Sequence, residues 1–290
     1  MTDRPGLTQA PARKALGQHF LFDPDILRRV ALAAGPVKGR DVIEVGPGPG
    51  GLTRALLDCG ANSLTCIEAD PRFTEALQAW PEAESNRLSV LQKDARKVEW
   101  ETLPHVERAA APVMIIANLP YNVGTPLLVN WLKAGSWRGE MALMFQKEVA
   151  ERTCAKPGER NYGRLAVLTA AVCDAAIAFT LPPGAFKPPP KVDSAVAIFR
   201  PLSADKRFDD LDSLEKVTTA AFGQRRKMLR AALKSLAKTV QLSPIEWIES
   251  CEVDPTARAE TLTQDQFRAL ARKFGEAANA RDTIQRRDAP

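Results

Sequence analysis

The stretch of sequence that decides the fold runs from residue 41 to residue 53 and reads DVIEVGPGPGGLT. Its first five residues are mostly apolar and predict a short buried strand, and the residues from 52 to 59 predict a helix. Glycines stand at alternate positions between the two: Gly46, Gly48 and Gly50. Such spacing allows a tight turn and a close approach of the backbone to a ligand. The free amides that open the following helix suit an anionic group.

Strand-like and helix-like segments alternate along the first two thirds of the chain. Further strands are expected at residues 64–67, 88–91, 113–117 and 141–145. Helices are expected at residues 26–34, 72–80 and 165–173. This alternation predicts parallel βαβ units and hence an α/β fold with a doubly wound, Rossmann-like sheet. Two late strands, at 177–181 and 195–199, are joined by a proline-rich loop and predict an antiparallel pair at the sheet edge.

Past Pro201 the sequence favours helices alone. They are expected at residues 211–221, 227–239, 244–250 and 264–274. We therefore predict four regions, which are a disordered N-terminus (1–13), the α/β domain (14–203), a small all-helical domain (204–274) and a flexible tail (275–290).

The composition of the 290 residues argues against several classes of protein. No run of 18 apolar residues is present, and the polar first residues have no secretory apolar core, so we expect a cytoplasmic protein without membrane contact. The five cysteines stand singly and there are two histidines, a pattern that predicts no metal site and no disulfide framework.

A basic run lies between Gly223 and Pro244, in a chain whose formal net charge is +5. It contains no acidic residue and six basic ones, Arg225, Arg226, Lys227, Arg230, Lys234 and Lys238. Such a run is either a solvated helix face or a surface for a polyanion. The choice depends on whether a site elsewhere acts on nucleic acid.

Two acids follow predicted strands, where α/β sheets place their ligands. Glu68 follows Gly46 by 22 residues and can accept both hydroxyls of a ribose. Asp94 ends the third strand and can accept from an adenine amino group. NAD and S-adenosylmethionine both fit this pattern. Glu44 favours the methyl donor because a carboxylate inside the first strand is unusual for a dinucleotide fold and needs a polar partner.

Asn118-Leu119-Pro120-Tyr121 follows the fourth predicted strand and matches the chemistry of an adenine amine. The N6 lone pair is delocalised into the ring, so the amine is a poor nucleophile. The side-chain oxygen of Asn118 and the carbonyl of Leu119 can accept its two N–H groups and favour a pyramidal nitrogen. Tyr121 offers a ring on which a flipped-out base stacks, worth about 1–3 kcal/mol.

The loop of residues 186–194, FKPPPKVDS, is a second candidate wall of the base pocket. Phe186 either covers the other face of the base or packs in the core of a rigid hairpin, and the sequence leaves these two interpretations open. Lys187 and Lys191 are candidates for holding phosphates.

These motifs together resemble the ribosomal RNA adenine dimethyltransferases, and within that family its bacterial 16S branch. The resemblance covers residues 14 to about 235. It rests on the segments GQHFL (17–21), GPGPG (46–50), NLPY (118–121), the 186–194 loop and AFGQRRKMLR (221–230), with Glu68 and Asp94.

The resemblance implies transfer of methyl groups from S-adenosylmethionine to N6 of two adjacent adenines in a small-subunit 16S rRNA hairpin, late in ribosome assembly. It implies S-adenosylhomocysteine as product, a monomer, and RNA contacts from the helical domain through Arg225, Arg226, Lys227 and Arg230. It also implies cofactor contacts from the residues that match His19, Leu21, Gly46, Glu68, Asp94 and Asn118. His19 departs from the asparagine usual in the family, and a histidine there is expected to add a pH dependence to cofactor binding.

Three alternatives remain at this point. A 23S rRNA adenine methyltransferase would share the core motifs, although the basic helical segment is more similar to the 16S branch. A DNA adenine methyltransferase typically has two prolines where this chain has Leu119-Pro120. A non-catalytic assembly factor would be expected to have lost the NLPY segment, which is intact here.

Overall fold

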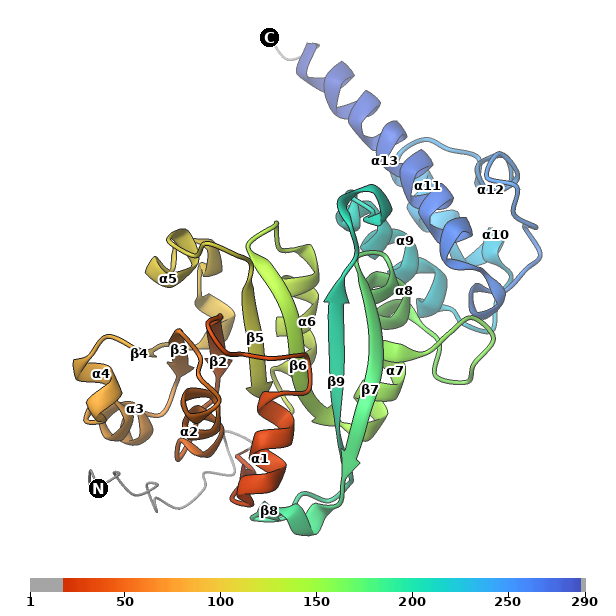
Figure 1. Cartoon of the computed structure of the whole chain (residues 1–290). Helices are drawn as coiled ribbons and strands as arrows, with labels where there is room; N and C mark the ends of the chain where they lie inside the picture. Colours follow the sequence, from red (N-terminus) through yellow and green to blue (C-terminus); the bar gives the residue numbers. More distant parts are fainter. Residues whose placement is uncertain (1–17, 288–290) are drawn as a thin grey trace. The chain divides into compact units, whose positions relative to one another are not determined.

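A computed structural model describes residues 18–287 of the chain, with side chains up to residue 281 (Figure 1). The predicted disordered N-terminus, residues 1–13, lies outside the described residues. The chain divides into two compact units, one made of residues up to Ala150 with Ala175–Pro201, and one made of Glu151–Asp174 with the chain from Leu202 onward. The sequence-based division assigned residues 151–174 to the α/β domain.

The first unit is built on a seven-stranded sheet. Its strands, in spatial order, are β4 (Leu88–Gln92), β3 (Ser63–Glu68), β2 (Asp41–Val45), β5 (Val113–Asn118), β6 (Arg138–Gln146), β9 (Ser194–Pro201) and β7 (Cys173–Leu181). The pairs among β4, β3, β2, β5 and β6 are parallel, and β9 pairs antiparallel with β6. The doubly wound sheet predicted from the alternation is confirmed. The strand order reverses between β2 and β5, and ligands bind at such switch points.

Helices precede, connect and follow the parallel strands. They are α1 (Pro24–Ala31), α2 (Gly51–Asp58), α3 (Pro71–Gln78), α4 (Pro81–Glu84), α5 (Pro104–Glu107) and α6 (Gly124–Lys133), and α7 (Lys147–Cys154) follows β6. The N-termini of α1 and α3 are encoded in the local sequence. Asp23 and Asp70 are their N-cap residues and accept amides of the first turn, and a proline follows each of them. A separate ribbon pairs β1 (Phe20–Leu21) antiparallel with β8 (Phe186–Lys187).

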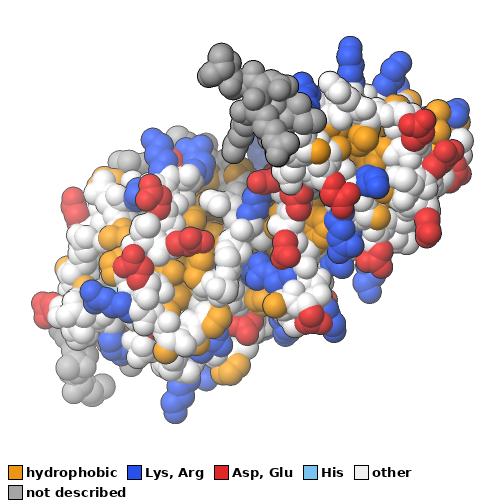
Figure 2. Space-filling view, turned by 90° about the horizontal axis from the view of Figure 1, so that it is seen from above, with side chains coloured by type: hydrophobic (Ala, Val, Ile, Leu, Met, Phe, Trp, Pro, Cys, Tyr) orange, Lys and Arg blue, Asp and Glu red, His pale blue; other side chains and the backbone are white. Residues whose placement is uncertain are grey.

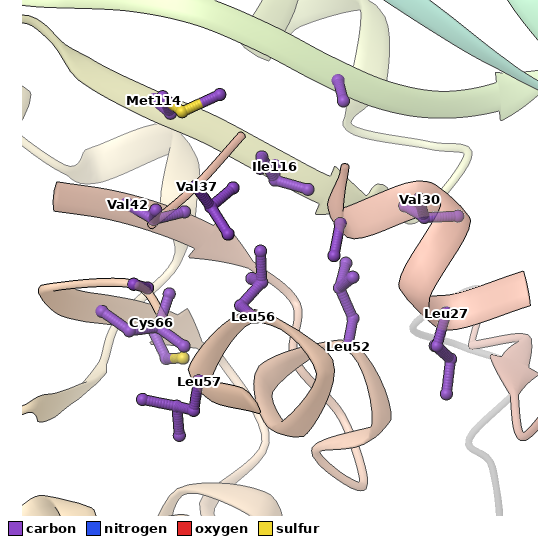
Figure 3. Packing of buried hydrophobic residues seen from close by; sticks show 14 of the residues in the cluster. Leu27, Val30, Val37, Val42, Leu52, Leu56, Leu57, Cys66, Met114 and Ile116 are labelled. Atoms are coloured by element: carbon purple, nitrogen blue, oxygen red, sulfur yellow. The ribbon is translucent and has the colours of Figure 1, made fainter. Parts of the chain in front are cut away.

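The core beneath the glycine turn is a continuous apolar layer (Figure 3). Leu52 and Leu56 of α2 point toward Val42 of β2 and Ile116 of β5, and Val30 of α1 extends the layer. All of these side chains are at most 5% exposed. Because parallel strands are covered on both faces, β2 is an almost continuous apolar run after Asp41, and Glu44 is the polar residue buried within it.

Gly50 serves this packing. It caps α2 in the left-handed conformation, with φ of 90°. A Cβ atom at this position would lie 2.7 Å from the Trp80 ring and 2.8 Å from Leu77. The third glycine of the turn therefore lets the start of α2 pack closely on α3 and on Trp80.

Gly50→Ala is expected to lower the free energy of unfolding by about 2–4 kcal/mol, because it adds both backbone strain and overpacking. Denaturant unfolding checks this, with Gly184→Ala as control, since a Cβ at Gly184 meets no atom within 4 Å. A loss at Gly50 no larger than that at Gly184 would contradict this role.

The second unit is helical. Its elements are α8 (Arg164–Ala170), α9 (Leu211–Gly223), α10 (Leu229–Ala232), α11 (Lys234–Thr239), α12 (Pro244–Glu249) and α13 (Gln264–Arg287). α9 contacts α8, α10, α11 and α13. No helix in the described part of the chain is both long enough and apolar enough to cross a membrane.

Two helix predictions in this unit are corrected. The helix expected at 227–239 is divided into α10 and α11, with Leu233 buried between them. The tail expected from residue 275 continues α13 as far as Arg287. Residues 276–287 contain no glycine or proline and include good helix formers such as alanine, glutamate and arginine, so nothing in them ends the helix.

Candidate active site

A cavity lies at the carboxyl ends of β2, β3, β4 and β5, next to the switch point of the sheet. Its lining includes eight of the predicted site residues, His19, Gly46, Gly48, Glu68, Asp94, Asn118, Leu119 and Tyr121. The structure thus brings together segments that are up to about a hundred residues apart in sequence. This agrees with the general position of ligands in open α/β sheets.

Glu68 and the glycine turn hold each other. One carboxylate oxygen of Glu68 accepts the amide of Gly48 at 3.1 Å, and the other accepts the amide of Asp70 at 2.8 Å. Burial raises the pKa of Glu68, although the backbone amides oppose this shift. A Cβ at Gly48 would lie 2.6 Å from the ring of Phe20. The turn therefore packs directly on the N-terminal segment, and the Glu68 carboxylate is fixed at the rim of the cavity.

Glu44 does not line the cavity. It is 1% exposed, and its Oε2 accepts the hydroxyl of Thr53 at 2.7 Å and the thiol of Cys66 at 3.5 Å. Burial raises the pKa of Glu44 to about 8. Its hydrogen bonds tie β2 to α2 and β3 behind the glycine turn, so the structure does not bring this candidate cofactor residue together with the others at the cavity.

Asp94 lines the cavity together with a cation that the sequence did not indicate. Its carboxylate accepts from Arg96 Nη2 at 2.6 Å and from the Arg96 backbone amide at 3.0 Å. These hydrogen bonds hold the pKa of Asp94 down at about 2, so the group is ionised at neutral pH. A ligand that donates a hydrogen bond to Asp94 therefore uses a carboxylate that Arg96 also contacts.

The side chain of Asn118 is oriented by the N-terminal segment. Its Nδ2 donates to the carbonyl of His19 at 3.0 Å, so Oδ1 is the remaining acceptor. Pro120 turns the chain, and its carbonyl accepts the amides of Val123 and Gly124 at the start of α6. Among the described residues no donor is bonded to the Leu119 carbonyl. The tetrapeptide therefore has two oxygen acceptors available.

Besides the β1–β8 ribbon, two hydrogen bonds of side chains join the N-terminal segment and the tetrapeptide to the 186–194 loop. The Nδ1–H of His19 donates to the carbonyl of Pro188 at 2.8 Å. The hydroxyls of Tyr121 and Ser194 are 2.7 Å apart. The rings of His19 and Tyr121 lie 5.4 Å apart and are tilted by 30°. His19 lines the cavity and thus connects the N-terminal segment to the tetrapeptide and to the 186–194 loop.

His19→Asn tests whether the histidine makes cofactor binding pH-dependent. The affinity of the wild type for S-adenosylmethionine is expected to depend on pH more than that of the variant, because an imidazole can change its charge and an amide cannot. Equilibrium binding titrations of both proteins measure it, and two parallel pH profiles would contradict the expectation.

Three other predicted site residues lie outside the cavity. Leu21 and Phe186 are paired across β1 and β8 and belong to the hydrophobic core, with 6% and 2% of their surface exposed. Gly50 packs on α3, as described above. Phe186 therefore has the hairpin-core position, one of the two interpretations that the sequence left open, and not the position of a pocket wall.

Several lining residues were not predicted. They include Gln18, Phe20, Lys93, Arg96, Asn122 and Val123. Phe20 lies inside the GQHFL segment, so its motif was found but its contact with Gly48 was not. Arg96 had no signal of its own, because a basic residue two positions after an acid is common at the surface. Among the described residues no cluster of three or more histidines, cysteines or acids is arranged to hold a metal ion.

The residues predicted to contact RNA are exposed, with one qualification. Lys187, Lys191, Arg226, Lys227 and Arg230 all lie at the surface. Arg225 is engaged, since its Nε lies 2.8 Å from Glu260 Oε2 and its Nη2 donates to the Arg160 carbonyl at 2.9 Å. On the face drawn in Figure 2, basic side chains are interspersed with acidic ones.

Comparison with known proteins gives consistent matches. A family profile described as "Ribosomal RNA adenine dimethylase" matches residues 10–275. "Ribosomal RNA small subunit methyltransferase A" of Gluconobacter oxydans (strain 621H) is 49% identical over 260 residues, which cover 90% of this chain and 82% of that protein. The protein of the same name from Agrobacterium fabrum (strain C58 / ATCC 33970) is 49% identical over 264 residues, which cover 90% of this chain and 92% of that protein.

Solved structures agree with this assignment. The crystal structure of a dimethyladenosine transferase from Plasmodium falciparum has a TM-score of 0.73 and 26% identity, covering 90% of this chain and 98% of that one. The 23S rRNA methyltransferase ErmE has a TM-score of 0.61 and 23% identity, covering 88% of this chain and 99% of that one, which is a likeness of fold. The chain therefore belongs to the ribosomal RNA adenine dimethylase family.

Proposed function

We propose that this enzyme transfers methyl groups from S-adenosylmethionine to N6 of two adjacent adenines in a hairpin of 16S rRNA, within an immature small ribosomal subunit. The product would be N6,N6-dimethyladenosine. The observation that carries the proposal is the orientation of Asn118, whose amide nitrogen is held by the His19 carbonyl so that its oxygen is left as an acceptor at the cavity. The choice of substrate is supported by the sequence motifs, by the family to which the chain belongs and by the names of the two relatives.

The residues around the cavity fit the cofactor. Glu68 accepts one amide at each oxygen and, as a carboxylate with about four lone-pair sites, keeps capacity for ribose hydroxyls. Asp94 is ionised and suits an adenine amino group. Gly46 and Gly48 line the cavity with backbone, which suits close approach of the turn to a ligand. When bound, S-adenosylmethionine supplies a methyl group already activated on a sulfonium.

The residues of the chain then need only to hold the adenine amine in position for the methyl transfer. The Asn118 oxygen and the Leu119 carbonyl accept the two N6–H groups, which favours a pyramidal nitrogen with its lone pair free. Glu68 and Asp94 would hold the cofactor, its sulfonium would supply the methyl group to N6, and N6 would release one proton to water for each methyl group that it gains. Tyr121 is held at its hydroxyl by Ser194 and presents its ring as a stacking surface for the base. Catalysis of this kind depends on alignment and preorganised dipoles.

Purified protein, labelled S-adenosylmethionine and immature small subunits test the proposal directly. Digestion of the RNA and chromatography are expected to show label in N6,N6-dimethyladenosine. In a parallel assay with large-subunit RNA as the substrate, label in that RNA instead would favour the 23S alternative. Binding of the small-subunit particle without any label would favour an assembly factor that does not catalyse.

A further inference from the structure

A second cavity lies within the C-terminal unit, where the turn η5 (Ala204–Lys206) and the residues after it face α13. Four of its lining residues are basic, namely Lys206, Arg207, Arg268 and Arg272, against one acidic residue, Asp205. These positions lie outside the basic run at 223–244 and outside the motifs discussed above. A hollow with this excess of positive charge concentrates anions.

The cavity is built on a fixed frame. The amide of Lys206 donates to the carbonyl of Ser203 at 2.9 Å and closes the η5 turn. The amide of Phe208 donates to the carbonyl of Ala171 at 2.9 Å, and the Phe208 ring is buried with 4% of its surface exposed. The segment that carries Lys206 and Arg207 is therefore held in place by backbone hydrogen bonds and by a buried aromatic side chain, and α13 carries the other two cations.

Arg272 and Lys206 are the cations free to receive a ligand. The Arg272 guanidinium carbon lies 5.4 Å from the centre of the Phe208 ring, which orients the planar group while leaving the residue exposed. Within residues 18–281 no carboxylate lies within ion-pair distance of Arg272 or Lys206. An oriented guanidinium suits two parallel hydrogen bonds to phosphate oxygens.

Arg268 adds positive charge deeper in the cavity. Its side chain is 19% exposed, and its Nη2 donates to the Ala170 carbonyl at 3.2 Å. The acid near it, Asp265, lies 3.6 Å from Nη1 but is itself 91% exposed, so water screens its charge. The buried Nε of Arg268 has no acceptor among the described residues.

We propose that this cavity binds one phosphate of the rRNA backbone. Arg272 and Lys206 contact the phosphate directly, and the positive charge of Arg268 attracts it from deeper in the cavity. The inference rests on the proposed function, because that function makes RNA the phosphate donor. Exposed cations hold an isolated anion weakly. When the RNA is already bound elsewhere on the protein, its backbone phosphates reach this cavity at a high effective concentration. A contact that is weak by itself then adds to the affinity for the whole RNA. The cavity thus provides a phosphate anchor separate from the basic run.

Neutralising the two cations tests the inference. Arg272→Gln and Lys206→Gln are each compared with Lys273→Gln, which removes the same charge from an exposed position outside the cavity on α13. Binding to immature small subunits is measured over a range of salt. Each cavity variant is expected to weaken binding about three- to tenfold, and the double variant to reduce the slope of log affinity against log salt by about one. The control is expected to stay within about twofold.

Each remaining outcome is informative. Circular dichroism verifies that the variants fold, and Arg272→Lys, which keeps the charge but loses the planar group, is expected to fall between wild type and glutamine. If Arg272→Gln and Lys206→Gln bind like Lys273→Gln, the inference is overturned while the proposed function stands. If inorganic pyrophosphate binds wild type but not the variants, and RNA affinity is unchanged, the cavity is a small-anion site and the inference is again overturned. Wild-type protein that neither binds nor methylates the particle contradicts the proposed function itself.

Discussion

Asn118→Ala is expected to slow adenine methylation by about 100-fold or more, while affinity for the small-subunit particle changes less than about twofold. Removing one preorganised polar partner from a reacting centre commonly costs this much. The variant loses the acceptor for one N6–H group, and it also loses the hydrogen bond to the His19 carbonyl, which orients the N-terminal segment at the cavity. Single-turnover methylation and particle binding, measured separately, distinguish chemistry from affinity.

Asn130→Ala is the matched control, because Asn130 is exposed on α6 and does not line the cavity. It is expected to keep the wild-type rate. If Asn118→Ala lost particle binding in parallel with methylation, Asn118 would be a binding residue, and its assigned role toward the amine would be wrong.

Glu44→Gln is expected to change how stability depends on pH. Burial raises the pKa of Glu44 to about 8 from an ordinary value of 4.5, so the folded chain retains a proton that the unfolded chain releases. The stability that this proton contributes is complete below about pH 4.5 and is lost as the pH rises through about 8. A shift of this size corresponds to several kcal/mol over the window.

Glutamine keeps an acceptor for Thr53 and Cys66 and cannot ionise. The variant is therefore expected not to lose stability as the pH rises toward about 8. Near pH 5 the two proteins are expected to be similar, and near pH 8 the variant is expected to be more stable by several kcal/mol. Urea unfolding at a series of pH values measures the difference. Glu75→Gln, at an exposed position on α3, is expected to show no such trend. If the free energies of unfolding of wild type and Glu44→Gln differed by the same amount at every pH, a protonated Glu44 in the folded chain would be contradicted.

Much of the first unit is readable from sequence because its signals are local. The β2 bounds, 41–45, agree with the prediction, since apolar runs mark buried parallel strands and glycines end them. β3 and β5 end at Glu68 and Asn118, one residue past the predicted strands, and these polar residues are the ones that line the cavity. The cavity itself follows from the general rule that ligands bind at strand ends.

The differences arise where a residue's environment depends on distant segments. Glu44 has the sequence position of a cofactor residue, but Thr53 and Cys66, from two other elements, enclose it. Phe186 is placed in the core by its pairing with Leu21, 165 positions away, which no local pattern encodes. Arg225 belongs to the basic run, yet Glu260 engages it from another part of the helical unit.

Mass spectrometry of small-subunit rRNA from cells that lack the gene tests most directly whether this chain dimethylates that RNA. N6,N6-dimethyladenosine is expected to be absent from those cells. Wild-type protein supplied in trans is expected to restore it, and Asn118→Ala is expected not to. Small-subunit rRNA whose dimethyladenosine content is unchanged without the gene would contradict the proposed function.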